Sequence, residues 1–202
     1  MIQVLAQVSP QVIADKKIYI VGGGASLVDF DWGQLQGRRV IAVNRAFEKV
    51  PMAEIIYFSD LRFWTWNQEA LVRHPARKIS CMRKLRHRSI EIVESTGIAG
   101  LELESGKIRT GNNSGYAAIN VAVHEGAKEI VLLGFDMGFT HGRCHWHDGY
   151  PVINVEKTFR PMISYFDTLP TILEGLGVKV VNANLDSMIT AFSKIRREDS
   201  LT

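Results

Sequence analysis

Short runs of apolar and β-branched residues recur along this chain, and this repetition constrains its fold more than any other feature. Each run stops at glycine or at a small polar side chain. Runs of this kind are typical of strands that are buried on both faces of a parallel sheet. They lie at residues 17–21, 39–43, 54–58, 78–81, 130–133 and 178–181.

Helical patterns separate these predicted strands. Residues 114–125 carry small and apolar side chains at helical spacing and stop at Gly126, and residues 160–176 do the same before Gly177. The alternation predicts an α/β fold: an open, mostly parallel, Rossmann-like sheet with helices on both faces, in three layers. The length of 202 residues suits one domain spanning 1–202 with a substantial core.

Polar or flexible residues follow the predicted strands. The carboxyl ends of parallel strands share one edge of a sheet, and ligands of open α/β proteins bind in a crevice at that edge. We therefore expect one binding site where the strand ends converge, at Gly22, Gly23, Gly24, Asn44, Ser59, Asp60, Gly134, Asp136, Asn182 and Asn184.

Bulk composition excludes several classes of protein. No apolar run approaches the roughly 20 residues of a membrane helix, and residues 1–10 lack the features of a secretory signal, so we expect a cytoplasmic protein. Cys81 and Cys144 are far apart, which argues against a disulfide framework or a cysteine-based zinc site. The formal charge of +3 is compatible with a phosphorylated ligand and is too small to indicate nucleic acid by itself.

Three segments have no clear periodicity. Residues 138–155, rich in Gly and His, are too long for an ordinary connection and are predicted to form a functional loop or lid. The tail at 196–202 is expected to fray. Residues 83–107 begin with a basic cluster that is either a solvated surface or a contact for phosphates of a nucleotide or of DNA, and the cluster comprises Arg83, Lys84, Arg86 and Arg88.

The most distinctive motif, Thr-Gly-Asn-Asn-Ser-Gly-Tyr at 110–116, directly precedes a predicted helix. Backbone N–H groups at a helix start lack partners, so such a start attracts an anion or a sugar hydroxyl. An ordinary turn needs one capping residue, whereas this motif offers several. The plainer interpretation makes Ser114 an N-cap.

A second motif, Gly-Gly-Gly-Ala-Ser at 22–26, follows the first predicted strand. Glycines allow a tight turn and a close approach to phosphate. The spacing matches neither the dinucleotide fingerprint nor a Walker loop. A tight strand-to-helix turn is therefore an equally good interpretation of this motif alone.

The two motifs together with Val-Asn-Arg at 43–45 and Gly-Phe-Asp at 134–136 resemble those of bacterial lipooligosaccharide sialyltransferases. The wider group also contains 6-hydroxymethylpterin diphosphokinase-like domains. The resemblance covers about two-thirds of the chain, from the opening strand to the Asn/Ser loop after residue 181. It is closer still to phage and prophage proteins that carry Asn-Asn-Ser-Gly-Tyr and a later His-Trp-His. If this chain is encoded by a phage, the expected location is the cytoplasm of the host.

This resemblance implies a cytidine-nucleotide site. In the sialyltransferases the glycine loop, the Asn after the second strand and the Ser-Gly helix start hold the nucleotide. For Asn44 the alternative is a polar cap on a strand. The implied nucleotide-binding residues are Gly22, Gly24, Ser26, Asn44, Ser114 and Gly115, with Gly23 and Asn113 beside them.

Histidines crowd the predicted loop, at positions 141, 145 and 147. In a strand-like stretch His145 and His147 point to the same side. One of them is a candidate general base for an acceptor hydroxyl, the role that a loop His has in the sialyltransferases. Alternatively, the pair binds a divalent metal with an Asp, although Mg²⁺ prefers oxygen ligands. The third interpretation is a polar loop whose histidines bond to backbone.

Other candidates lie at strand ends. Asp60 and Asp136 could each bind a metal or a ligand hydroxyl, and for Asp136 a turn-capping role is favoured. The aromatic residues in 63–66 either stack on a base or sugar or bury the apolar face of a helix, and the second is favoured.

The sequence thus predicts a nucleotide-binding transferase, most simply a glycosyltransferase moving a sugar from a nucleotide-activated donor to an acceptor hydroxyl. No metal or other cofactor is required in that scheme. The alternatives are an Mg²⁺-dependent pyrophosphoryl transferase acting on a pterin-like compound and a non-catalytic phage accessory protein.

Overall fold

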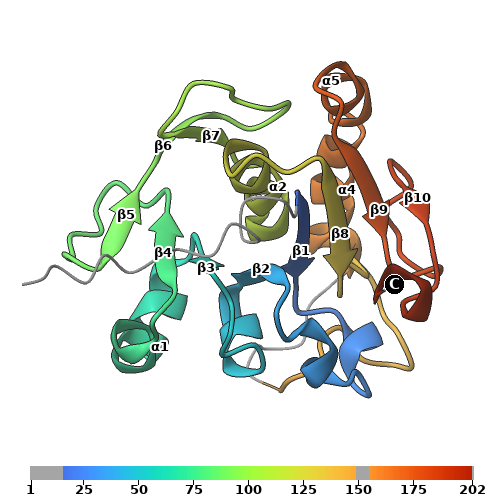
Figure 1. The fold of residues 1–202 in the computed structure, drawn as a ribbon, viewed down its shortest axis with the longest axis horizontal. Helices are drawn as coiled ribbons and strands as arrows, with labels where there is room; N and C mark the ends of the chain where they lie inside the picture. Colours follow the sequence, from blue (N-terminus) through green and yellow to red (C-terminus); the bar gives the residue numbers. More distant parts are fainter. Residues whose placement is uncertain (1–15, 149–154, 202) are drawn as a thin grey trace, which may run out of the picture.

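A computed structural model describes residues 16–148 and 155–201, and it contains a parallel sheet of eight strands in the order β10-β9-β8-β1-β2-β3-β4-β5 (Figure 1). Every pairing in this sheet is parallel. The strands are β1 (Lys17–Val21), β2 (Arg39–Val43), β3 (Ile55–Tyr57), β4 (Arg77–Ser80), β5 (Ile90–Ile92), β8 (Glu129–Leu133), β9 (Lys179–Asn182) and β10 (Ser193–Lys194).

Helices cover both faces of this sheet, so the predicted three-layer α/β architecture is confirmed (Figure 1). Alternate strand residues face opposite layers: Ile18 and Ile20 pack in one core, and Tyr19 and Val21 in the other. The first core lies under α2 (Ser114–His124), α4 (Arg160–Phe166) and α5 (Pro170–Gly175), and the second under α1 (Leu61–Arg73) and the short 3₁₀ segments. A further short helix, α3 (Val155–Thr158), precedes α4.

The predicted helix at 160–176 is two helices, and the reason is Pro170. Proline has no N–H and its ring clashes with the carbonyl four residues earlier, so a helix cannot run through it. It is tolerated in a first turn, which is where α5 places it.

Residues 83–107, whose sequence has no clear periodicity, contain β5 and β6 (Glu94–Gly97). Strand β6 pairs with β7 (Lys107–Arg109) in a separate two-stranded sheet.

The C-terminal tail is docked, and the prediction that 196–202 frays was wrong for the residues described. Glu198–Leu201 forms a 3₁₀ helix. The Tyr19 hydroxyl donates to the Ser200 carbonyl at 3.0 Å, and Arg197 donates to the Ser26 carbonyl at 2.7 Å. These contacts tie the tail to the loop after β1.

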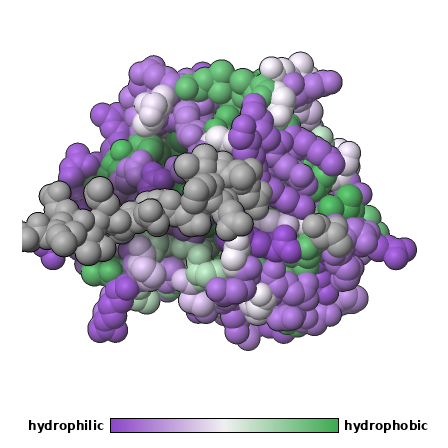
Figure 2. Space-filling model, viewed as in Figure 1, coloured by the Kyte–Doolittle hydropathy of each residue, from purple (hydrophilic) through white to green (hydrophobic). Residues whose placement is uncertain are grey.

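No helix among residues 16–148 and 155–201 is long and apolar enough to cross a membrane. The face seen in Figure 2 is largely hydrophilic, with separate hydrophobic patches. One patch lies over the loop that joins β6 and β7, where Ile98 and Leu103 are exposed.

Strand order places a crevice between β1 and β8. From β1 the chain proceeds to β2 on one side, whereas from β8 it proceeds to β9 on the other. Such a reversal is the topological switch point at which open α/β sheets bind ligands, outside the carboxyl ends of the strands.

Candidate functional site

A cavity of about 590 Å³ opens at this switch point, a volume typical of small-molecule sites. Its walls come from the ends of β1, β2, β3 and β8, from the start of α2, from the histidine loop and from α3 and α4. The residues that carry the argument below are Gly23, Asn44, Arg45, Ser59, Asp60, Arg62, Asn113, Ser114, Met137, Cys144, His145, His147, Phe159 and Met162.

The structure brings most of the sequence-predicted site residues together here. Ser26 and Asp136 do not line the cavity, and neither do Asn182 and Asn184, which were also expected at this edge of the sheet. The residues that do are Gly22, Gly23, Gly24, Asn44, Asp60, Asn113, Ser114, Gly115, His145 and His147.

The glycine loop packs tightly against the loop after β8. Gly22 N–H donates to the Leu133 carbonyl and Gly24 N–H to the Gly134 carbonyl, both at 2.8 Å. A Cβ at Gly22 would lie 2.7 Å from the Gly134 oxygen, and one at Gly24 would lie 2.3 Å from a carboxylate oxygen of Asp136. Both glycines are therefore required for loop-to-loop packing, and their N–H groups are already engaged. This favours the tight-turn interpretation of the motif.

Asp136 is a buried anchor, 2% exposed, and does not face the cavity. Its carboxylate accepts hydrogen bonds from Ser26 N–H at 2.8 Å and from the Ser26 hydroxyl at 2.5 Å. It also accepts from the Thr140 hydroxyl and the Asn184 amide, both at 2.9 Å. The favoured turn-fixing role of Asp136 is confirmed. Ser26 serves the same junction, so its hydroxyl is turned away from the predicted nucleotide site.

Asn113, rather than Ser114, caps the helix start. Its side-chain oxygen accepts from Gly115 N–H at 2.8 Å and from Tyr116 N–H at 3.1 Å. The interpretation of Ser114 as the N-cap was therefore wrong. The Ser114 hydroxyl instead lies 2.8 Å from that of Ser59, and both residues line the cavity. A hydroxyl that follows the end of β3 and one from the first residue of α2 thus meet at one wall.

Asn44 begins the loop after β2 in an unusual conformation. Its φ is +51°, in the left-handed region, which Asn tolerates better than most residues. Its side-chain oxygen is buried and has no hydrogen-bond partner among the described residues. Buried acceptors are normally satisfied, so this oxygen is suited to a ligand donor. Its neighbour Arg45, which the sequence reasoning missed as a site residue, pairs with Glu48 at 2.8 Å.

The histidine loop is attached to the glycine loop through Trp146. Trp146 N–H donates to the Gly23 carbonyl at 3.1 Å, and its indole N–H donates to the Gly22 carbonyl at 3.2 Å. Side chains alternate across such an extended segment, so His145 and His147 both face the cavity. Their rings are parallel within 4°, with 5.2 Å between centroids. The predicted same-side arrangement is confirmed.

Both imidazoles are neutral at neutral pH. Burial, then the nearby His145 and Arg45, lower the pKa of His147 to about 4. Burial also lowers the pKa of His145, although a hydrogen bond with Gly23 and the charge of Asp136 oppose that shift. A neutral imidazole nitrogen can accept a proton, so either ring meets the first requirement of a general base.

One wall of the cavity is apolar. Met137, Phe159 and Met162 form it, and the amide nitrogen of Asn113 lies 3.7 Å and 3.6 Å from the two methionine sulfur atoms. Cys144 adjoins this wall, and burial raises the pKa of its thiol, so it is protonated at neutral pH. No motif marks these residues in the sequence.

Asp60 supplies the only carboxylate among the described residues that line the cavity. It caps α1 by accepting from Arg62 N–H at 2.7 Å, and the Arg62 guanidinium lies 3.2 Å away. Burial raises its pKa, but the interactions with Arg62 outweigh burial and leave the pKa below its ordinary value. Residues 16–148 and 155–201 contain no group of three or more His, Cys, Asp or Glu side chains placed to hold a metal ion.

The aromatic and basic segments lie apart from this site. Phe63 and Trp64 are buried under the sheet, as the favoured interpretation predicts, whereas Trp66 is 61% exposed. The basic cluster is exposed on the loop between β4 and β5 and does not line the cavity. Of the predicted functional loop at 138–155, residues 149–154 lie outside the described residues.

Comparison of the chain with protein-family models, with curated proteins and with solved structures finds no match.

Proposed function

We propose that this protein is a nucleotide-binding transferase that moves a glycosyl group from a nucleotide-activated donor to an acceptor hydroxyl. The observation that carries the proposal is the convergence, at the switch point, of the unpartnered Asn44 side-chain oxygen and the Ser59–Ser114 hydroxyl pair with two neutral imidazoles. The resemblance of the motifs to those of the sialyltransferases supports it independently.

We assign the nucleotide to the wall between β2 and α2. The unpartnered side-chain oxygen of Asn44 can accept an N–H or O–H from a base or ribose. The Ser59 and Ser114 hydroxyls can donate to a phosphate, and Arg45 supplies positive charge nearby. Because the N–H groups of Gly22 and Gly24 are engaged, the hydroxyl pair is assigned the larger part in phosphate binding.

We assign His145 as the general base. Its Nδ1 would lie 3.4 Å from a Cβ at Gly23, which places the ring against the glycine loop at the cavity. With a pKa near 4, His147 is the weaker base, and it packs against its neighbour. The acceptor oxygen forms a bond to the anomeric carbon while its proton passes to His145. The bond from that carbon to the phosphate oxygen breaks, and the nucleotide leaves with the electron pair.

The pyrophosphoryl-transferase alternative needs Mg²⁺, which prefers several oxygen ligands. Among the described lining residues only Asp60 offers a carboxylate, and it already caps α1. This donor set fits Mg²⁺ poorly, so no step of the proposed reaction passes through a metal.

The proposal is tested by thermal-shift screening against CMP, CDP, UDP, GDP and ATP, each with and without Mg²⁺. A nucleotide that binds only the folded state raises the unfolding temperature by mass action. We expect such a rise with at least one nucleotide in the absence of metal. A well-folded sample that responds to none of them contradicts the proposal, and a response to ATP only with Mg²⁺ favours the alternative.

A further inference from the structure

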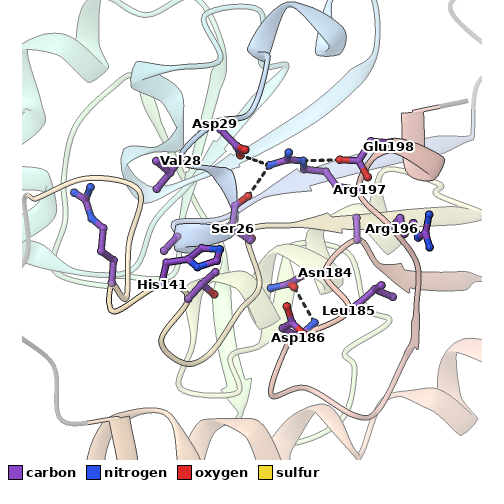
Figure 3. A pocket seen from close by; sticks show the side chains of 14 residues that line it. Ser26, Val28, Asp29, His141, Asn184, Leu185, Asp186, Arg196, Arg197 and Glu198 are labelled. Carbon is purple, nitrogen blue, oxygen red and sulfur yellow. Dashed lines mark hydrogen bonds and ion pairs between the residues drawn. The ribbon is translucent and has the colours of Figure 1, made fainter.

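A second cavity, of about 450 Å³, is lined by Ser26, Asn184 and their neighbours (Figure 3). It shares no lining residue with the first. Three segments form it: the loop after β1, the tip of the histidine loop and the chain on either side of β10. The residues that matter here are Val28, Asp29, His141, Arg143, Asn184, Leu185, Asp186, Arg196, Arg197 and Glu198.

Hydrogen bonds hold these segments in place. Asp136 binds Ser26, Thr140 and Asn184, one residue from each of the loops after β1, β8 and β9. Asn184 also accepts from Asp186 N–H at 2.9 Å, which fixes the turn at the base of the cavity (Figure 3). The segments that form the cavity are therefore held in place by hydrogen bonds to the buried Asp136 carboxylate.

A two-residue turn directs His141 toward this cavity. Thr140 and Arg143 exchange backbone hydrogen bonds at 2.8 Å and 3.0 Å, and the turn between them has positive φ at His141 (+50°) and Gly142 (+76°). Positive φ is costly for most side chains and tends to persist at functional positions. In Figure 3 the His141 ring lies between the segments that carry Ser26 and Asn184.

Ion pairing leaves one guanidinium available in this cavity. Arg197 pairs with both Asp29, at 2.8 Å, and Glu198, at 3.5 Å, and its hydrogen bond lowers the pKa of Asp29. Arg196 is exposed, and its guanidinium has no ion-pair or hydrogen-bond partner among the described residues. Among the described residues Arg143 pairs with Asp148, whose side chain is 93% exposed, and exposed pairs of this kind are weak.

Apolar and acceptor groups complete the site. Val28 and Leu185 are 55% and 53% exposed, and both line the cavity. The Asp186 carboxylate can accept from a ligand O–H. The combination suits a ligand with an anionic head, hydroxyl groups and a compact carbon skeleton.

We propose that this second cavity binds a small hydroxylated organic anion, about the size of one sugar ring, whose carboxylate or phosphate is held by Arg196. A carboxylate or phosphate accepts paired hydrogen bonds from a guanidinium. The proposal is independent of nucleotide binding, because the two cavities have separate linings.

Three hexoses that differ at carbon 6 test the proposal: glucose 6-phosphate, glucuronate and glucose. We expect calorimetric titration of the full chain at low salt to show saturable binding of at least one of the two anions, with no saturation by glucose. Comparison of the affinities for glucose 6-phosphate and glucuronate shows whether the site prefers a phosphate or a carboxylate. Arg196→Gln weakens binding about tenfold, by loss of a charge-assisted contact, whereas the matched control Arg88→Gln, on the β4–β5 loop, leaves it unchanged.

The proposal is overturned if neither anion saturates, if glucose binds as well as they do, or if Arg196→Gln binds like the wild type. Competition with a nucleotide provides an independent check. Saturating CMP leaves the anion affinity unchanged if the sites are separate, and simple competition places the anion in the first cavity and refutes the proposal. CMP binding without anion binding refutes only the second site, whereas anion binding without any nucleotide response refutes only the proposed function.

Discussion

The rings of His145 and His147 lie parallel, 5.2 Å apart between centroids, on the cavity side of a loop whose intervening Trp146 is bonded to the glycine loop. This geometry explains why the two histidines come as a pair. The Trp146 indole holds the loop in place by its hydrogen bond to the Gly22 carbonyl. Because side chains alternate along the segment, both imidazoles then lie on the same wall of the cavity. The two rings nevertheless differ in basicity, which leads to distinct predictions for each.

His145→Ala is expected to lower turnover by roughly 10²- to 10⁴-fold, the range for loss of a general base. Nucleotide affinity is expected to change little, because Asn44, Ser59 and Ser114 are assigned to the nucleotide. The measurement is release of free nucleotide from the nucleotide sugar that binds, alongside calorimetric affinity. His147→Ala is the matched variant, with a smaller expected loss, and a larger loss in His147→Ala than in His145→Ala reverses the assignment.

Stability is expected to fall between pH 6.5 and pH 4 in part because of His147. Its folded pKa is about 4, whereas an unfolded histidine has a pKa of about 6.5. The unfolded chain therefore binds the proton first as pH falls, and folding loses free energy across that window. Since the ring is only partly buried, we expect His147 to reduce the free energy of unfolding by about 1–2 kcal/mol, which is less than the whole difference between the two pKa values would give.

Urea unfolding at pH 7 and pH 4.5 measures this effect. In His147→Gln the drop in unfolding free energy between the two pH values should be smaller than in the wild type by about that 1–2 kcal/mol. Burial also lowers the pKa values of His145 and His74, so a residual drop in the same direction remains. An equal drop in both proteins shows that His147 is not the source.

Adjacent glycines are expected to respond differently to the same substitution. Gly24→Ala places a Cβ 2.3 Å from a buried Asp136 oxygen, whereas Gly23→Ala makes ordinary contacts with His145, at 3.4 Å, and His147, at 3.7 Å. We expect Gly24→Ala to cost about 2 kcal/mol or more of stability and Gly23→Ala less than about 1 kcal/mol. Gly23→Ala should instead weaken nucleotide binding, because it narrows the cavity. Chemical denaturation and calorimetry separate the two effects, and equal stability losses contradict the packing account.

Removal of the Asp136 carboxylate is expected to be severely destabilising. Asp136→Ala leaves the buried donors of Ser26 and Asn184 without their acceptor, at an expected cost of about 3 kcal/mol or more. Asp148→Ala is the control, since its carboxylate is 93% exposed and its pair with Arg143 is weak. Urea denaturation at pH 7 provides both values. Comparable small losses in the two variants would show that Asp136 is not the junction of the three loops.

The site could be predicted from sequence wherever it lies at a strand end. Parallel strands deliver their carboxyl ends to one edge, so Asn44, Asp60 and the start of α2 were placed together without knowledge of contacts. The sequence did not reveal which polar side chains bond to each other. Ser26 and Asp136 look like ligand groups in the sequence, but they satisfy each other across 110 residues.

The parts that escaped prediction depend on long-range packing. Met137, Phe159 and Met162 carry the apolar character of core residues, and only the position of α4 beside the end of β8 turns them into a cavity wall. Strand β6 has the sequence Glu-Ser-Thr-Gly and mostly exposed side chains, so no periodic signal marks it. This segment is a strand because its backbone pairs with β7, and local sequence patterns do not encode such a pairing.

The central claim is that the cavity between Asn44 and Ser114 binds a nucleotide, and calorimetric titration of an Asn44→Ala variant tests it most directly. With the nucleotide that gives the largest thermal shift, we expect saturable binding to the wild type and about tenfold weaker binding to Asn44→Ala. Asn67→Ala, a half-buried asparagine on α1 outside the cavity, should bind like the wild type. Equal affinity of Asn44→Ala and the wild type, with both variants folded, contradicts the account.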